Sequence, residues 1–405
     1  MRSSGAKFGH RSCSRIEVGL SPKIIGYSGI RFAALRCIGV IALAGIMLAG
    51  NVFTAHAESA ETGSVASYAP GANWGGIAGT ATIRYVTESP TGATTIATGI
   101  IAVPDGPAPR QGWPVVAWDH GTRGLGPACG LTARPGFDAE LLRRLVDLGY
   151  AVVAPDYVGL GPGAETAHPY LQSRTEATAT IDLVRAARHA DPRLSNTWAV
   201  AGLSQGGHAA LNSGYLAGGY APELDFRGIV ALAPASNVEN VLPMFGPQAP
   251  ALPVLTPVVG LVAAVFDGMR VGAPDFDLGP YLTTDGAELL DRMAFSCGPE
   301  WAQRVGTETL GSVLAQPLSA GPLRDRLRRY ASVPTAGYSR PILIAHGMAD
   351  ITVPIAASMA LTDQLRANGV DFTFRTYPAA DHDGVVDAAW PDVVDFLGRV
   401  LPRPT

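Results

Sequence analysis

Lysine is almost absent from this sequence. The 405 residues contain only Lys7 and Lys23, both near the N-terminus. Charged residues of either sign make up 16% of the chain, whereas apolar residues make up 47%. Disordered chains have the opposite balance. The composition therefore excludes a largely disordered protein and provides ample apolar material for a buried core.

The first 57 residues have the features of an export signal. Basic residues precede an apolar run from Ile38 to Phe53, and Ala55-His56-Ala57 has the small-x-small pattern of a cleavage site. The apolar run covers about 16 residues, and a helix needs about 20 to span a bilayer. We therefore expect cleavage near Ala57 and a secreted chain, extracellular or periplasmic, rather than a membrane anchor.

Cleavage at that point changes what the remaining chain can do. It removes both lysines, so Schiff-base chemistry through a lysine is excluded. It also removes seven basic residues and one acidic residue, which moves the formal net charge from -4 to about -10 and argues against a nucleic-acid partner. Of the four cysteines, Cys129 and Cys297 remain. In an oxidising compartment, one even pair favours a disulfide over two buried free thiols.

Strand and helix patterns alternate through most of the mature chain. After a Gly/Ala-rich lead at 58–79, two β-branched stretches predict an antiparallel hairpin. Apolar runs of strand length then alternate with segments of helical periodicity, which is typical of an α/β fold with a mostly parallel sheet and helices on both faces. We expect strands at 81–86, 94–103, 114–119, 151–154, 197–202, 228–233, 341–345 and 372–377, and helices at 137–148, 172–190, 205–217, 355–367 and about 385–400.

The alternation stops between Pro234 and Arg340. About 100 residues there have no clean strand pattern and many prolines, which is too long for a loop between two strands. We interpret 235–340 as a cap or lid inserted into a core made of 58–234 and 341–405. The apolar stretch at 241–269 fits packing of the cap's own core or lining of an acyl pocket, and the two are compatible.

One motif suggests a nucleophile. Gly202-Leu203-Ser204-Gln205-Gly206 matches the G-x-S-x-G pattern of a nucleophile elbow. The pattern alone is weak, because a chain with 48 glycines contains roughly a third of a match by chance. However, an expected strand ends just before it and a Gly/Ala-rich helix begins just after it, as the motif requires. We therefore predict that Ser204 is a catalytic nucleophile.

A serine nucleophile needs two partners. An imidazole must take its proton, and a carboxylate must orient the imidazole. In this fold the three groups follow in the order serine, acid, histidine. Asp350 and His382 follow the strands expected at 341–345 and 372–377, and ligands of open α/β sheets bind at such strand ends. We predict Asp350 as the acid and His382 as the base.

Other acids and histidines have simpler explanations. Asp381 and Asp383 flank His382 but are too close in sequence to reach its Nδ1 easily. We expect His208 to help pack the helix after Ser204. Loop-shaping or supporting roles are expected for His168, His346 and Asp156.

A tetrahedral intermediate also requires an oxyanion hole. One backbone N–H comes from the residue after the nucleophile and one from the loop after the third strand of the fold. We assign the first to Gln205. The second is expected from Thr122, with Gly121 as the alternative, and the Thr122 hydroxyl is a further candidate donor.

Several segments resemble the secretory lipase family, the lipase A-like group of α/β-hydrolases. They span roughly residues 110 to 385. The matching features are Trp118-Asp119-His120-Gly121-Thr122, Cys129, Val153-Ala154-Pro155-Asp156-Tyr157, Gly159-Leu160-Gly161, His168-Pro169-Tyr170, Ser204-Gln205-Gly206-Gly207-His208, Tyr220-Ala221-Pro222-Glu223-Leu224, Asp350 and His382.

This resemblance implies an α/β-hydrolase fold with the cap inserted before the strand that precedes the catalytic acid. It implies an exported esterase or lipase acting without a cofactor, and we identify no metal ligands. It also implies a disulfide between Cys129 on the oxyanion loop and Cys297 in the cap.

The resulting prediction is hydrolysis of carboxylic esters through an acyl-enzyme. A peptidase or amidase with the same triad is the main alternative, but the cap stretch 241–265 lacks basic residues, which favours apolar ester substrates. A non-catalytic binding module of the same fold is a third reading, against which the ordered triad argues. We expect a small-molecule, lipid or polymer ester as partner, with transient contact with a lipid interface where the substrate is a lipid.

Overall fold

The computed structural model describes residues 61–402. The expected signal sequence and its cleavage site near Ala57 lie outside the described residues.

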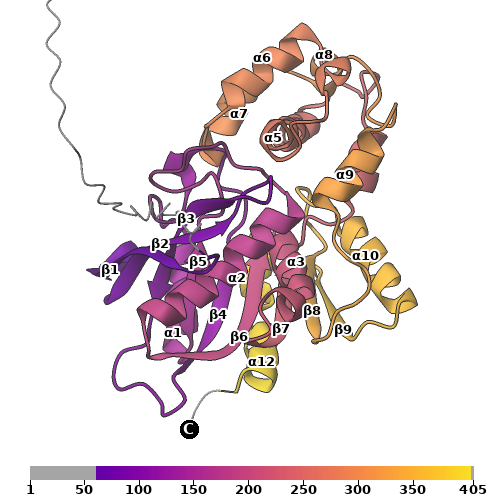
Figure 1. Cartoon of the computed structure of the whole chain (residues 1–405). Coiled ribbons are helices and arrows are strands. Elements are labelled where there is room, and N and C mark those ends of the chain that lie inside the picture. The colour runs from indigo at the N-terminus through magenta and orange to yellow at the C-terminus, as the bar shows by residue number, and fades with distance from the viewer. Residues whose placement is uncertain (1–60, 403–405) are drawn as a thin grey trace, which may run out of the picture. The chain divides into compact units, whose positions relative to one another are not determined.

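A nine-stranded sheet forms the centre of the described chain (Figure 1). Its strand order is β1-β2-β3-β5-β4-β6-β7-β8-β9. Strands β4 to β9 pair in parallel with one another, whereas β1, β2 and β3 pair antiparallel, so the sheet is mostly parallel as predicted. The strands are β1 (Val65–Ala72), β2 (Thr80–Glu88), β3 (Thr94–Ala102), β4 (Trp113–Asp119), β5 (Ala151–Pro155), β6 (Leu194–Leu203), β7 (Asp225–Leu232), β8 (Ile342–Gly347) and β9 (Phe372–Tyr377).

Strand β1 lies within the Gly/Ala-rich lead at 58–79, where no strand was predicted. It contains Pro70 and Gly71, which strand interiors disfavour. It lies at the edge of the sheet, and its register with β2 shifts twice, after Val65 and after Ala69. An edge strand tolerates proline and irregular register, so pairing with β2 rather than residue propensity produces this strand.

Helices cover both faces of the sheet. Alternate side chains of β4 enter two apolar layers, because neighbouring residues of a strand point to opposite faces. Val115 and Ala117 belong to the layer that contains α2, α3 and α10, whereas Val116 and Trp118 belong to the layer that contains α1, α11 and α12. These helices are α1 (Asp138–Asp147), α2 (Ser173–Ala190), α3 (Gln205–Tyr220), α10 (Ile355–Ala367), α11 (Val385–Ala388) and α12 (Trp390–Val400).

The single helix expected near 385–400 is wrong in one respect. The structure divides it into α11 and α12, with Ala389 between them. Pro391 lies in the first turn of α12. Proline lacks the N–H that would continue a helix from the preceding turn but is well suited to a helix start.

The chain between β7 and β8 is helical and supplies most of a third apolar core. Residues 233–341 contain six α-helices and no strand, and Figure 1 shows them grouped at one end of the sheet. Val262, Phe266 and Met269 of the central helix are buried in this separate core. The helices are α4 (Val238–Val241), α5 (Thr256–Gly272), α6 (Thr284–Met293), α7 (Trp301–Val305), α8 (Leu310–Val313) and α9 (Leu323–Ala331).

Helix α5 and the short turn before it are unusually apolar. The segment Pro253–Gly272 is long and apolar enough to cross a membrane, by length and composition only. However, 56% of its most apolar stretch is buried inside the protein, and buried core helices meet the same criterion.

Candidate active site

Ser204 lies at a sharp turn between β6 and α3. Its backbone φ of 60° and ψ of -118° are unfavourable for a residue with a side chain. A Cβ at Gly202 would collide with the carbonyl of Gly206, and a Cβ at Gly206 would collide with the carbonyl of Asp119. Both motif positions therefore require glycine, and the turn presents Ser204 at the carboxyl end of β6.

His382 is hydrogen-bonded to Asp350. The distance from His382 Nδ1 to Asp350 Oδ2 is 2.6 Å. Asp350 Oδ1 accepts backbone N–H bonds from Thr352 (2.8 Å) and Val353 (2.9 Å). Burial raises the pKa of Asp350, but hydrogen bonds from His346 and His382 outweigh it and hold the pKa well below its usual value. The ionised carboxylate accepts the Nδ1 proton of His382, which leaves Nε2 with its lone pair.

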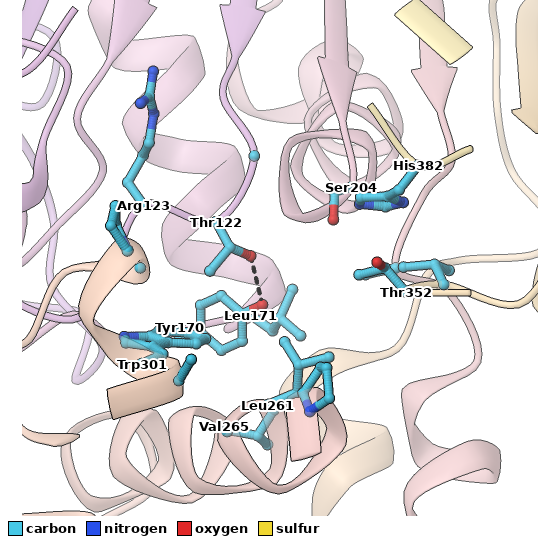
Figure 2. A pocket seen from close by; sticks show the side chains of 18 of the residues that line it. Thr122, Arg123, Tyr170, Leu171, Ser204, Leu261, Val265, Trp301, Thr352 and His382 are labelled. Atoms are coloured by element: carbon cyan, nitrogen blue, oxygen red, sulfur yellow. Dashed lines mark hydrogen bonds between the residues drawn. The ribbon is translucent and has the colours of Figure 1, made fainter. Parts of the chain in front are cut away.

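Ser204 and His382 lie side by side in the wall of one pocket (Figure 2). Ser204 comes from the turn after β6, and His382 comes from the segment between β9 and α11. The structure thus brings together three residues that are far apart in the sequence, with Asp350 behind the ring of His382.

The flanking acids do not replace Asp350. Asp381 Oδ1 accepts the backbone N–H of Gly384 at 2.8 Å. Asp383 lines the pocket. Within residues 61–402, Asp350 is the carboxylate bonded to His382.

The other histidines and Asp156 hold surrounding segments in place. His346 is part of β8 rather than of the loop after it, because β8 continues to Gly347, and its Nε2 donates to the Val353 carbonyl at 2.9 Å. His208 is buried on α3, as expected. Asp156 accepts hydrogen bonds from the hydroxyls of Thr98 and Thr132 and from the Thr132 N–H.

The predicted oxyanion donors adjoin Ser204. Gln205 is the first residue of α3, where a backbone N–H has no acceptor within the helix. Gly121 follows β4, and a Cβ placed on it would lie 3.8 Å from the Cβ of Ser204. Thr122 lines the same pocket, and its Oγ1 lies 2.7 Å from Tyr170 Oη.

His120 stabilises the loop that carries Gly121 and Thr122. Burial lowers its pKa to about 3, with a smaller contribution from the nearby charge of Arg123. The neutral ring donates from Nδ1 to the Gly121 carbonyl at 2.6 Å. This bond constrains the Gly121–Thr122 peptide, the same peptide that bears the Thr122 N–H.

The pocket has a volume of about 830 Å³. One wall comes from the segments that carry Thr122, Ser204 and His382, and the other comes from the helices between β7 and β8. The second wall is mainly apolar and includes Val238, Leu242, Leu261, Val265 and Trp301. Among the described residues, no group of three or more His, Cys, Asp or Glu side chains is arranged to hold a metal ion.

A disulfide ties the two walls together. Cys129 and Cys297 are bonded, which is the pairing that the family resemblance implied. Gly124 and Cys297 also form an isolated antiparallel β-bridge. The Leu125 N–H donates to the Ser296 carbonyl at 3.0 Å, beside the same disulfide.

Several pocket residues were not anticipated from the sequence. Arg123 and Arg134 line the pocket, and Arg123 is paired with Asp138. Leu171 lines it with a backbone φ of 61°. Tyr170 belongs to a segment that resembles the family, but the spacing of residues in the sequence does not predict its contact with Thr122.

A mostly parallel sheet, a strained serine turn and a cap-like helical insertion define the class of α/β-hydrolases. Solved structures support this fold. Candida antarctica lipase A in its closed state superposes with a TM-score of 0.67, at 19% identity, over 85% of this chain and 84% of that chain. The rice cell wall degrading esterase LipA from Xanthomonas oryzae gives a TM-score of 0.69, at 20% identity, over 84% of this chain and 99% of that chain.

The sequence profile of the secretory lipase family matches residues 128–394. The chain therefore belongs to the secretory lipase family, whose name describes hydrolases of ester substrates. No curated protein sequence matches the chain.

Proposed function

We propose that this protein is a secreted serine hydrolase that cleaves carboxylic esters through an acyl-enzyme on Ser204. The observation that carries the proposal is the position of Ser204, on a strained turn beside His382, whose Nδ1 is bonded to Asp350. Each group has the role that this chemistry requires: Ser204 is the nucleophile, His382 the general base and Asp350 the group that orients the imidazole.

In the first half of the reaction, His382 Nε2 takes the hydroxyl proton as Ser204 Oγ attacks the ester carbonyl carbon. The N–H groups of Gln205 and of Thr122, or of Gly121, stabilise the negative oxygen of the tetrahedral intermediate. The imidazolium of His382 then gives its proton to the leaving alcohol as the ester C–O bond breaks. Water repeats the sequence on the acyl-enzyme, releasing the acid and restoring Ser204.

The pocket favours esters with apolar acyl groups. The wall formed by residues of α5 and its neighbours is apolar, and apolar pockets bind apolar groups by removing them from water. We propose that residues 235–340 act as the cap that forms this wall, inserted into the core at 58–234 and 341–405. A peptidase is less well supported, because no cation is contributed to the pocket by the cap.

Removal of the nucleophile tests this function. Ser204→Ala should abolish hydrolysis of p-nitrophenyl butyrate and labelling by a fluorophosphonate probe, since the probe reacts with an activated serine. Full esterase activity in the variant would refute the proposal, and failure of the wild-type protein to react with the probe would favour a binding module.

Secretion needs a test of its own. Expression of the full chain in a host that exports proteins should give a mature product that begins near Glu58, as measured by intact mass and N-terminal sequencing. Retention of the first 57 residues on a membrane-bound product would refute it.

A further inference from the structure

A group of buried polar side chains lies behind Ser204, and the reaction as proposed does not use them. His168, Glu176, Gln205 and His208 are all fully buried. Glu176 lies in the first turn of α2, whereas Gln205 and His208 lie on α3. A buried carboxylate costs several kcal/mol unless hydrogen bonds and opposite charge compensate. Hydrogen bonds from its neighbours supply this compensation for Glu176, whereas Gln205 Oε1 is buried without a hydrogen-bond partner among residues 61–402.

The Gln205 side chain is held by two of these residues. His168 Nδ1 donates to the Val158 carbonyl at 2.7 Å, so its Nε2 accepts from Gln205 Nε2, also at 2.7 Å. Burial lowers the pKa of His168, in agreement with this neutral form. The second amide hydrogen of Gln205 goes to Glu176 Oε1 at 2.8 Å. The reversed amide would put its oxygen against the Glu176 carboxylate, so the orientation is determined by chemistry.

The remaining bonds of Glu176 reach the pocket wall and α9. Oε1 also accepts the backbone N–H of Leu171 at 3.1 Å. Leu171 lines the pocket and has a left-handed backbone, which persists only when its surroundings hold it. Oε2 lies 2.6 Å from His208 Nδ1, and His208 Nε2 donates to the Ala331 carbonyl at 3.0 Å.

We propose that Glu176 is a positioning residue for the ester hydrolysis proposed above. Its Oε1 holds both the Gln205 side chain and the Leu171 backbone, and its Oε2 faces His208 Nδ1. Glu176 thereby fixes Gln205, whose backbone N–H donates to the oxyanion. It also fixes Leu171, which forms part of the pocket wall. This inference rests on the proposed function, because a fixed Gln205 matters only if a negative oxygen develops beside it.

The expected effect is on turnover rather than on substrate binding. An oxyanion donor acts by being held where charge develops, and small displacements of such groups cost catalysis strongly. Glu176→Ala should lower kcat for p-nitrophenyl butyrate by about 10- to 100-fold per active site, with KM changed by less than about 3-fold. Active sites are counted by fluorophosphonate labelling, so that unfolded protein does not enter the rate.

Glu176→Gln is the conservative rescue. The amide oxygen of the new side chain can accept from Gln205 and Leu171, and its NH2 can donate to His208 Nδ1 while His208 Nε2 still donates to Ala331. This variant should keep kcat within a few-fold of the wild-type value.

Asp182→Ala supplies a matched control on the same helix. Asp182 is buried and accepts hydrogen bonds from Thr87 (2.8 Å) and Tyr220 (3.0 Å), away from the pocket. Its loss should lower the melting temperature but leave kcat per labelled site unchanged. A Glu176→Ala variant with unchanged kcat per site, or a Glu176→Gln variant as slow as Glu176→Ala, would overturn the positioning role.

A second variant keeps the test valid if Glu176→Ala does not fold. Gln205→Leu retains the backbone N–H of Gln205 but removes both bonds of its side chain, and it should lower kcat by about 10-fold or more. An unchanged kcat overturns the proposal. Ser204→Ala distinguishes failure of the proposed function from failure of the positioning role. If Ser204→Ala still hydrolyses esters, the proposed function fails. If Ser204→Ala is inactive and Gln205→Leu has an unchanged kcat, only the positioning role fails.

Discussion

At the scale of single residues, Asp350 shows how backbone contacts decide side-chain chemistry. Two N–H groups hold Oδ1, so the other oxygen faces His382. In Asp350→Asn the same N–H groups would select the amide oxygen, and the new NH2 would point at His382 Nδ1. The imidazole would then accept at Nδ1 and carry its proton on Nε2, where it cannot take the proton of Ser204.

We therefore expect Asp350→Asn to lower kcat by about 1,000-fold or more, measured with p-nitrophenyl butyrate. Asp381→Asn is the control, because an asparagine oxygen can still accept the Gly384 N–H, and its kcat should match that of the wild type. A slow Asp381→Asn together with an active Asp350→Asn would reverse the assignment of the acid.

At the scale of elements, the proposed function makes α5 the part of the pocket wall best placed to select the acyl group. Leu261 and Val265 are one helical turn apart and both line the cavity. Leu261→Trp adds bulk there and should lower kcat/KM for a laurate ester at least about 10-fold more than for an acetate ester. The ratio of the two substrates is the measurement, and an unchanged ratio would place the acyl chain elsewhere.

The disulfide is a second device at this scale, since it joins segments 168 residues apart. The double variant Cys129→Ser, Cys297→Ser should lower the free energy of unfolding by about 2–5 kcal/mol, because the unfolded chain regains freedom. The Gly124–Cys297 bridge keeps the two segments in register, so kcat should fall less than about 10-fold. Denaturant unfolding and steady-state rates measure the two effects, and a stable but inactive double variant would contradict this account.

At the scale of the whole molecule, the buried neutral His120 makes stability depend on pH. Its pKa is about 3 when folded, against 6.5 for the ordinary side chain. Below pH 6.5 the unfolded chain binds a proton that the folded protein does not bind. Stability is therefore lost as the pH falls from 6.5 toward 3, by up to about 1.4 kcal/mol per pH unit.

His120→Gln removes this titration while keeping a side-chain N–H donor. The loss of unfolding free energy between pH 7 and pH 5 should be about 2 kcal/mol smaller in the variant than in the wild type. His189→Gln is the control, because His189 is exposed on α2, and it should follow the wild-type curve. Parallel curves for all three proteins would show that His120 does not govern the acid response.

Local patterns in the sequence determined much of this fold. The helix 355–367 and the strand 372–377 are found at the predicted bounds, because each has a clear periodicity and clear ends. The candidate site was also readable, since glycines mark a sharp turn, and Asp350 and His382 follow strands whose carboxyl ends meet at one edge of a parallel sheet. The sequence also predicts removal of the first 57 residues, which would leave a single pair of cysteines. The described residues do not test this prediction.

Only the tertiary structure decided the features that depend on distant neighbours. Edge strand β1 exists through its pairing with β2, against its own proline and glycine. The pocket wall on α5 also depends on tertiary packing. In the sequence, Glu176 is an ordinary acidic residue in a first helical turn. Its hydrogen bonds with Gln205 and Leu171 are found only once α3 and the Leu171 backbone pack against it. Periodicity reports which side of an element is buried, but it does not report which polar groups meet there. Ser204 is thus predicted as a nucleophile from its own neighbours in the sequence, whereas the groups that hold its surroundings are found only in the fold.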